Sequence, residues 1–250
     1  VNLLRGEIRP IVKNAAGDIH SSENYRPIMN SSCLLKVIEH CILLGLNKYV
    51  PLHLTQFGFR KNTCTKQAIL CIKEVVCKYN SQGSDVFSCF LDLSKAFDKV
   101  NHSKLLMKLI EYRVPPPIVK LLQNMYENQT VHVCFDGIKS QGWVMKNGVR
   151  QGGILSPLLF NLYINDIIRD INEMKVGCRL GIENFSLLAY ADDLCISAPT
   201  PKVLQMLIDK TFRKLHELSL NINIGKTTCM TFKSRNSIIH DYQFYCKDVP

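Results

Sequence analysis

Apolar and polar positions along the chain follow two periods, and together they predict a protein of mixed α-helices and β-strands. Apolar residues recur at three- and four-residue spacing in five segments, which indicates amphipathic helices at 33–49, 68–79, 102–112, 118–128 and 203–218. Shorter apolar or alternating runs predict strands at 7–12, 86–92, 130–135 and 142–145. The first helix should face the core with Leu34, Val37, Ile38, Ile42 and Leu46.

Turn and helix-start residues divide these segments. Pro115, Pro116 and Pro117 cannot continue a helix, so they separate two of the predicted helices. Asp136-Gly137 lies between two alternating runs, as in a β-hairpin. Ser156-Pro157 predicts another helix start, with serine as the N-cap and proline in the first turn.

The stretch 186–197 carries the strongest chemical signal. Two short apolar runs flank Asp192 and Asp193, which predicts a β-hairpin with both carboxylates at its tip. The alternative is that this Asp-Asp pair supplies only turn chemistry. A second strand-like run, 86–92, also ends on a carboxylate, that of Asp92.

If these strands are neighbours, their aspartates form an acidic cluster. Two carboxylates ~4 Å apart repel by roughly 4 kcal/mol at an effective dielectric of 20, and divalent cations would neutralise them. Oxygen ligands with open positions suit Mg²⁺. Two such ions would activate an attacking hydroxyl and stabilise the leaving oxygen of a phosphoryl transfer.

Three segments, in order, resemble motifs A, B and C of reverse transcriptases. They are Phe90-Leu-Asp-Leu-Ser-Lys-Ala-Phe-Asp98, Gly148-Val-Arg-Gln-Gly-Gly-Ile-Leu-Ser-Pro157 and Tyr190-Ala-Asp-Asp193. The similarity is greatest to the enzymes of non-LTR (LINE-like) retrotransposons and extends from about residue 8 to about 232. It implies an α+β right-hand polymerase fold, with an antiparallel palm sheet backed by helices and with fingers. A thumb is not recognisable.

The resemblance also implies a domain organisation. Residues 1–85 would be mainly fingers, residues 86–235 mainly palm with a fingers insertion, and residues 236–250 the truncated start of the next segment. Because the chain begins with valine and ends abruptly, we expect it to be part of a longer open reading frame. The family implies that an endonuclease domain lies elsewhere in that protein.

The family also assigns roles to individual residues. Asp92, Asp192 and Asp193 would be catalytic and, with the Leu93 carbonyl, would bind two Mg²⁺ ions, for which Mn²⁺ could substitute. Residues expected to bind the incoming nucleotide are Arg60, Lys61, Phe97, Gln151, Gly152 and Lys226. Of these, Phe97 would exclude the 2′-hydroxyl and Lys226 would protonate pyrophosphate. Residues expected to contact template or primer are Arg26, Tyr190 and Arg150. Structural alternatives are a core aromatic for Phe97, a structural arginine for Arg26, and solvated basic residues for Lys61 and Lys226. Residues 148–153 could also be only a glycine-rich helix entrance.

Composition agrees with this assignment. A net charge of +10 and a pI near 9.1 favour a polyanionic partner, here an RNA template and a DNA primer. The 11 cysteines lack a C-x-x-C pair, and several, such as Cys71, Cys89 and Cys195, lie in apolar runs that predict burial. Without a signal peptide or membrane-spanning stretch, we expect an intracellular protein, nuclear or cytoplasmic.

Two other functions are considered. An RNA-dependent RNA polymerase would be expected to carry an acidic residue five places after Asp92, where this chain has Phe97. A non-enzymatic RNA-binding remnant of a retroelement would retain the basic cleft without catalysis, but all three aspartates are present.

Overall fold

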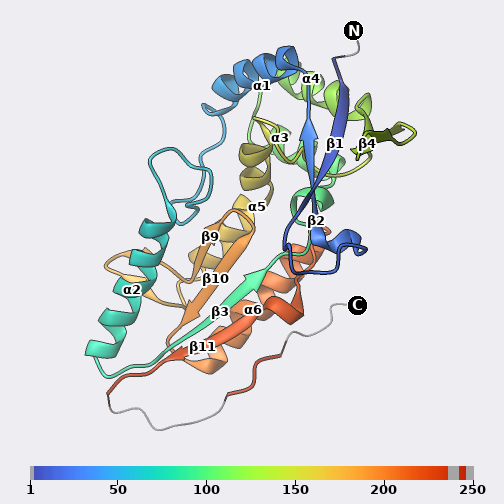
Figure 1. Cartoon of the computed structure of the whole chain (residues 1–250). Helices are drawn as coiled ribbons and strands as arrows, with labels where there is room; N and C mark the ends of the chain where they lie inside the picture. Colours follow the sequence, from blue (N-terminus) through green and yellow to red (C-terminus); the bar gives the residue numbers. More distant parts are fainter. Residues whose placement is uncertain (1–2, 236–241, 246–250) are drawn as a thin grey trace. The chain divides into compact units, whose positions relative to one another are not determined.

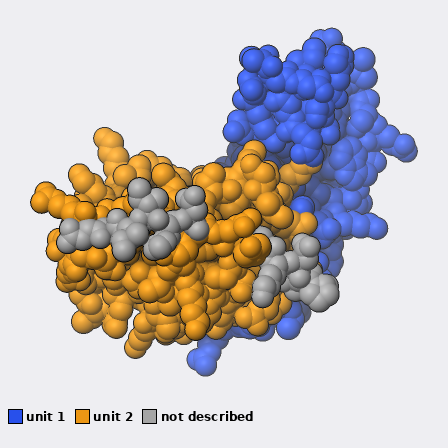
Figure 2. Space-filling model, turned by 90° about the horizontal axis from the view of Figure 1, so that it is seen from below, with its two compact units in different colours: residues 1–51, 97–160 blue, residues 52–96, 161–250 orange. Residues whose placement is uncertain are grey.

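The strands form separate sheets in the two units into which the chain divides (Figure 1). A computed structural model describes residues 3–235 and 242–245. Unit 1 contains residues 1–51 and 97–160, and unit 2 contains residues 52–96 and 161–250 (Figure 2). The expected segment at 236–250 lies largely outside the described residues.

Unit 1 is built on a sheet in the order β2-β1-β4-β5, with β6 also paired to β4. β1 is antiparallel to β2 and parallel to β4. The strands are β1 (Arg5–Val12), β2 (Tyr25–Asn30), β4 (Thr130–Phe135), β5 (Ile138–Lys139) and β6 (Trp143–Val144). The helices are α1 (Cys33–Leu46), α3 (His102–Glu111), α4 (Pro116–Glu127) and the short 3-10 turns η1 (Ser22–Asn24) and η2 (Phe97–Lys99). The predicted hairpin at Asp136-Gly137 is confirmed, as the turn between β4 and β5.

Helix α1 is present, and its predicted core face is right for Ile42 and Leu46 but wrong for Leu34 and Val37. The buried residues are Leu35, Glu39, Ile42 and Leu46, whereas Leu34 and Val37 are 64% and 61% exposed. The cause is Glu39, a charged residue that hydropathy places at the surface. Within unit 1 its carboxylate is paired with Arg150, and this compensates for its removal from water.

Unit 2 is built on a four-stranded sheet in the order β11-β3-β10-β9, in which every pair is antiparallel. Its strands are β3 (Val86–Asp92), β9 (Leu187–Tyr190), β10 (Asp193–Ala198) and β11 (Thr228–Phe232). A small hairpin joins β7 (Arg179–Leu180) and β8 (Glu183–Asn184). The remaining elements are α2 (Thr65–Ser81), α6 (Pro201–Glu217), η3 (Ile224–Lys226) and α5 (Ser156–Glu173), which begins in unit 1 and continues into unit 2.

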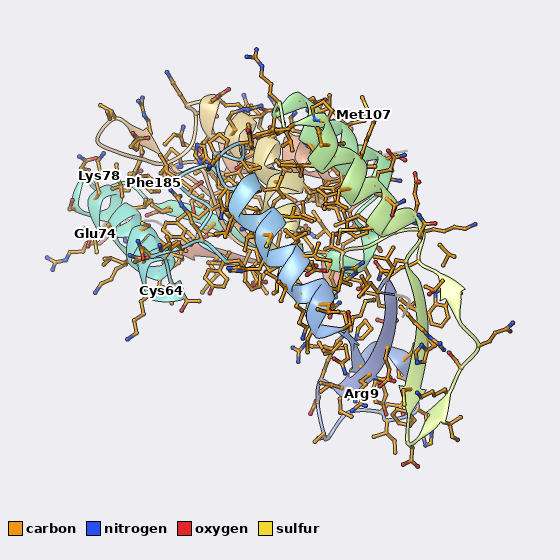
Figure 3. The ribbon with its side chains drawn as sticks, turned by 90° about the horizontal axis from the view of Figure 1, so that it is seen from above. Arg9, Cys64, Glu74, Lys78, Met107 and Phe185 are labelled. Atoms are coloured by element: carbon orange, nitrogen blue, oxygen red, sulfur yellow. The ribbon has the colours of Figure 1, made fainter. Side chains whose placement is uncertain are left out.

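Helices α6 and α2 of unit 2 contact this sheet. Helix α6 packs on β3 and β10, and its first turn is capped by the Thr200 hydroxyl, which accepts from the backbone N–H of Val203. Helix α2 contacts β3 and β9; Cys64 and Lys78 mark its two ends in Figure 3. Only its C-terminal half enters the core, where Val75 packs with Val86 and Cys178.

The burial predicted for the cysteines is right for Cys89 and Cys195 and only partly right for Cys71, which is half-buried. Five of the described cysteines are exposed, namely Cys33, Cys41, Cys64, Cys77 and Cys229. Among the described residues, no helix has the length and apolar character needed to cross a bilayer.

Candidate active site

Two of the predicted carboxylates meet at one end of the unit 2 sheet. Asp92 is the last residue of β3, and it lies directly opposite Asp193, the first residue of β10. Tyr190 lies opposite Asp193 on the other side, so these three residues form one row across the sheet. Directly opposed residues have their Cβ atoms about 4.5–5.5 Å apart. The predicted hairpin, and its adjacency to the strand ending at Asp92, are confirmed.

Asp192 occupies the hairpin turn beside this row. The turn has two central residues, of which Ala191 adopts the left-handed conformation with φ 56°. A non-glycine residue in this region costs about 1–2 kcal/mol, so the surrounding structure must hold the turn in place.

The carboxylates perturb one another. Burial raises the pKa of Asp192, and the neighbouring charges of Asp193 and Asp92 raise it further, against the lowering effect of its own backbone hydrogen bond. The pKa of Asp193 is raised by burial and then by Asp92. Burial and mutual repulsion therefore both disfavour the charged forms of Asp192 and Asp193.

The donor set fits magnesium rather than a closed metal cage. Across the described part of the chain, no three His, Cys, Asp or Glu side chains are arranged to hold a metal ion by themselves. Magnesium usually binds through one or two carboxylates while its other positions hold water and phosphate oxygens. Mutual repulsion between Asp92, Asp192 and Asp193 is what a divalent cation would relieve. Leu93, which follows Asp92, forms an antiparallel bridge with Ile222. The hydrogen bonds of this bridge are made by its neighbours, from the N–H of Ser94 to the Asn221 carbonyl and from the N–H of Asn223 to the Asp92 carbonyl.

Lys226 supplies one positive charge beside the row. Its Nζ lies 3.9 Å from Oδ2 of Asp92, and its side chain is 69% exposed. η3, which carries Lys226, is placed there because the backbone N–H of Asn223 donates to the carbonyl of Asp92 at 2.8 Å.

A cavity of about 520 Å³ adjoins the row within unit 2. One wall is a stripe of α2 at helical spacing, formed by Thr65, Ala68, Ile69 and Ile72. The others come from the sheet, including Phe90, Leu188 and Cys195, and Asp92, Asp193, Tyr190 and Lys226 reach the cavity. The lining is therefore mainly apolar, with its charges at the carboxylate row.

Arg60 and Lys61, two of the residues expected to bind the incoming nucleotide, lie in unit 2. Arg60 Nη1 donates to the carbonyls of His53 and Leu54 at 3.2 and 3.3 Å, so the guanidinium also holds its own loop. Lys61 is exposed. Their nucleotide-binding roles stay predictions.

In unit 1, the Gly148–Gly153 loop of motif B is hydrogen-bonded to the last two residues of motif A, Phe97 and Asp98. Nε2 of Gln151 donates to Oδ1 of Asp98 at 2.8 Å, and the backbone N–H of Val149 donates to the carbonyl of Phe97 at 2.8 Å. The Phe97 ring is half-buried and stacks on Phe160 with centroids 4.6 Å apart. Gly152 has φ 103° and lies against the Met29 carbonyl, so protein fills the space its missing side chain leaves.

Arg150 does not fit its predicted contact with template or primer. Its side chain is 3% exposed and is paired with Glu39 at 2.5 Å. Nε also donates to Oε1 of Gln129 at 2.8 Å. The second Glu39 oxygen accepts from the backbone N–H of Ile154 at 2.7 Å. Because these groups are buried together in unit 1, Arg150 is a structural residue of the loop. Arg26, on β2, is exposed, and its role stays a prediction.

Sequence reasoning missed three residues that hold these segments. No role was predicted for Asp98, whose carboxylate accepts a hydrogen bond from the Gln151 side chain. Glu39 was hidden because an isolated glutamate predicts a surface position. Gln56, 0% exposed, contacts the hairpin turn of unit 2. The signal for Gln56 was its place two residues before Gly58 in a loop already marked as functional.

The family described as reverse transcriptase (RNA-dependent DNA polymerase) matches residues 12–243. The chain is 31% identical over 233 residues to the Pol polyprotein of the type-2 retrotransposable element R2DM of Drosophila melanogaster, covering 89% of this chain and 21% of that protein. It is 26% identical over 230 residues to the RNA-directed DNA polymerase from mobile element jockey of the same species, covering 85% and 24%.

A telomerase from Candida tropicalis, solved with a fragment of telomeric RNA, shares the fold with a TM-score of 0.67 at 13% identity, covering 92% of this chain and 41% of that one. The expected polymerase fold and the motif-based resemblance are thereby confirmed. The chain spans between about a fifth and a third of the length of the first curated relatives it matches.

Proposed function

Because the chain belongs to the reverse transcriptase (RNA-dependent DNA polymerase) family, we propose that it copies an RNA template into DNA by adding deoxynucleoside triphosphates to a primer 3′-hydroxyl. The observation that carries the proposal is the register of the unit 2 sheet, which sets Asp92 directly opposite Asp193 beside Asp192. The net charge of +10 supports binding to a nucleic-acid duplex.

Asp92 and Asp192, with the Leu93 carbonyl, would hold two magnesium ions, with manganese as a substitute. Bound magnesium would lower the pKa of the primer hydroxyl and stabilise the charge on the departing pyrophosphate. Asp193 shapes the field at the site. Lys226, close to Asp92, would donate a proton to the pyrophosphate as a general acid.

The other predicted residues would bind and select substrate. Arg60 and Lys61 would contact the triphosphate, Gln151 and Gly152 the incoming nucleotide, and Phe97 the sugar, where it would leave no room for a 2′-hydroxyl. Arg26 and Tyr190 would contact template or primer.

We assign the four-stranded sheet of unit 2 to the palm and the sheet of unit 1 to the fingers region. In the cell, the chain would act within a longer polypeptide that carries an endonuclease domain, in the nucleus or cytoplasm.

The test is primer extension on an RNA template with Mg²⁺, comparing the wild type with Asp192→Asn and with Asp136→Asn. Asp136 is an exposed residue of the β4–β5 turn with φ 48°, a conformation that asparagine tolerates. We expect Asp192→Asn to reduce extension by roughly 10²–10³-fold or more and Asp136→Asn to leave it unchanged.

Extension by Asp192→Asn at the wild-type rate would refute the site. A preference for ribonucleoside triphosphates would instead indicate an RNA polymerase. RNA binding by a wild-type chain that extends no primer would indicate a non-enzymatic remnant.

A further inference from the structure

The hairpin turn that carries Asp192 is held from outside the hairpin. In a two-residue turn, the strand pairing does not use the backbone N–H of the first central residue, here Ala191. That N–H donates to Oε1 of Gln56 at 3.1 Å. The same Gln56 oxygen accepts from the backbone N–H of Gly58 at 2.8 Å. One buried amide oxygen therefore joins the strained turn to a segment more than 130 residues away in the sequence.

The segment that contains Gln56 is attached to strand β9 along its length. The backbone N–H of Phe57 donates to the carbonyl of Ala189 at 2.8 Å, and the N–H of Ala189 donates to the carbonyl of Thr55 at 2.9 Å. Gln56 and Ala189 form a parallel bridge. The Gln56 side chain is thereby fixed relative to the strand that leads into the turn.

Gly58 brings the segment into direct contact with the turn. A Cβ at this position would lie 2.2 Å from the backbone nitrogen of Ala191 and 2.8 Å from the carbonyl carbon of Tyr190. Real Cβ contacts are never this short, so any side chain here would displace either the loop or the turn.

Three buried asparagines of α5 anchor this arrangement. Nδ2 of Asn161 donates to the Gly58 carbonyl at 2.7 Å, and Oδ1 of Asn165 accepts from the backbone N–H of His53 at 2.8 Å. Asn172 contacts both the segment that contains Gln56 and strand β9: its Nδ2 donates to the Thr55 hydroxyl at 3.1 Å and to the Leu187 carbonyl at 2.9 Å. All three are at most 4% exposed.

We propose that Gln56 is a positioning residue that fixes the Asp192–Asp193 turn in the geometry needed to bind divalent cations, with Gly58 and the α5 asparagines as its support. The role requires an acceptor without charge, because a carboxylate at this position would add to the negative charge of Asp92, Asp192 and Asp193. This inference rests on the proposed function, since it assumes that the turn binds the metal ions of the polymerase.

The experiment measures Mn²⁺ binding by electron paramagnetic resonance, alongside primer extension, for the wild type, Gln56→Met and Thr211→Val. Methionine preserves the size of glutamine and removes the acceptor oxygen. Thr211 is an equally buried residue of unit 2, on α6, whose hydroxyl donates to the Leu207 carbonyl away from the turn. We expect Gln56→Met to weaken Mn²⁺ binding about 10–100-fold, the effect typical of losing a residue that orients metal ligands. Thr211→Val should bind as the wild type does.

Ala191→Gly provides a rescue that loss of stability alone would not predict. Glycine adopts φ 56° without strain, so the turn would need less external support. We expect Ala191→Gly to restore part of the Mn²⁺ affinity lost by Gln56→Met. Wild-type affinity in Gln56→Met, or an equal loss in Thr211→Val, would overturn the inference.

The two proposals fail in different ways. If the Mn²⁺ affinity of the chain depends on Gln56 but the wild type extends no primer, the polymerase assignment alone is contradicted. Extension that is lost in Asp192→Asn and unchanged in Gln56→Met would contradict the positioning role alone.

Amide hydrogen exchange tests the contact in the wild-type chain, without any variant. The N–H of Ala191 lies at a hairpin tip, where exchange is ordinarily fast. We expect it to be protected because it donates to Gln56. Exchange of Ala191 at the rate of an unprotected amide would also overturn the inference.

Discussion

The hairpin turn of unit 2 and the Gly148–Gly153 loop of unit 1 each carry predicted site residues, and buried side chains hold them in different ways. The turn is held by the neutral oxygen of Gln56. The loop is held by a buried ion pair, Arg150 with Glu39. The difference follows the local charge: a carboxylate acceptor beside Asp92, Asp192 and Asp193 would increase their repulsion, whereas the loop has no such cluster of aspartates.

The two clamps also differ in what their loss would cost. A neutral hydrogen bond contributes about 1 kcal/mol of net stability, whereas removing one partner of a buried ion pair costs about 3–5 kcal/mol because a charge is left unpaired. Breaking the Arg150–Glu39 ion pair should therefore mainly reduce the stability of unit 1. Losing the Gln56 hydrogen bond should mainly change the geometry of the site in unit 2.

The largest expected effect is that of Glu39→Gln. It leaves the buried Arg150 guanidinium without its counterion, so the free energy of unfolding measured in urea should fall by about 3–5 kcal/mol. The double variant Glu39→Leu with Arg150→Met removes both charges and should lose clearly less than Glu39→Gln alone. Equal losses in the two variants would show that the charge is not the cause.

A smaller effect is expected from Asp98→Ala, which removes the acceptor for Gln151. A hydrogen bond to a charged group contributes about 1.5–3 kcal/mol, and less at this half-buried site. We expect the KM for deoxynucleoside triphosphate to rise roughly 3–10-fold, since about 1 kcal/mol corresponds to a factor of 5, with a smaller change in kcat. The control is Asp18→Ala, which also removes the acceptor of one hydrogen bond, from the backbone N–H of His20. If the KM of Asp98→Ala equals that of Asp18→Ala, the Asp98–Gln151 hydrogen bond does not contribute to nucleotide binding.

The smallest effect is on the stability of the metal-free hairpin. Because the pKa of Asp192 is raised in the folded chain, its contribution to stability is present at low pH and is lost as the pH rises through that raised value. Asp192→Asn removes a charge that is disfavoured first by burial and then by repulsion from Asp193 and Asp92, so at pH 7.5 without divalent metal its Tm should exceed that of the wild type by about 1–3 °C. The gain should disappear below a pH of about 3.8, where the aspartate is protonated in both states. A wild-type Tm above that of the variant at pH 7.5 would show that the charge of Asp192 does not destabilise the folded hairpin.

The sequence by itself determined the α-helices, the hairpin and the family, because these depend on local periodicity and on ordered motifs. It did not predict the strands β2 and β11. Asp192-Asp193 between two apolar runs indicated the hairpin tip, and the run ending at Asp92 indicated its partner strand. These predictions are confirmed because strand pairing depends on the alternation of apolar and polar residues and on turn-forming residues, and both can be read from short segments of the chain.

Only the tertiary structure decided how the site is supported. The buried face of α1 depends on the pairing of Glu39 with Arg150, which the periodicity of apolar residues does not predict. Because Arg150 is buried in the same pair, its side chain is not exposed for contact with nucleic acid. Gln56 and Asp98 found their partners 135 and 53 residues away. The partners that make burial of Glu39, Arg150 and Gln56 tolerable are distant in the sequence, so the fold rather than the neighbouring residues sets their positions.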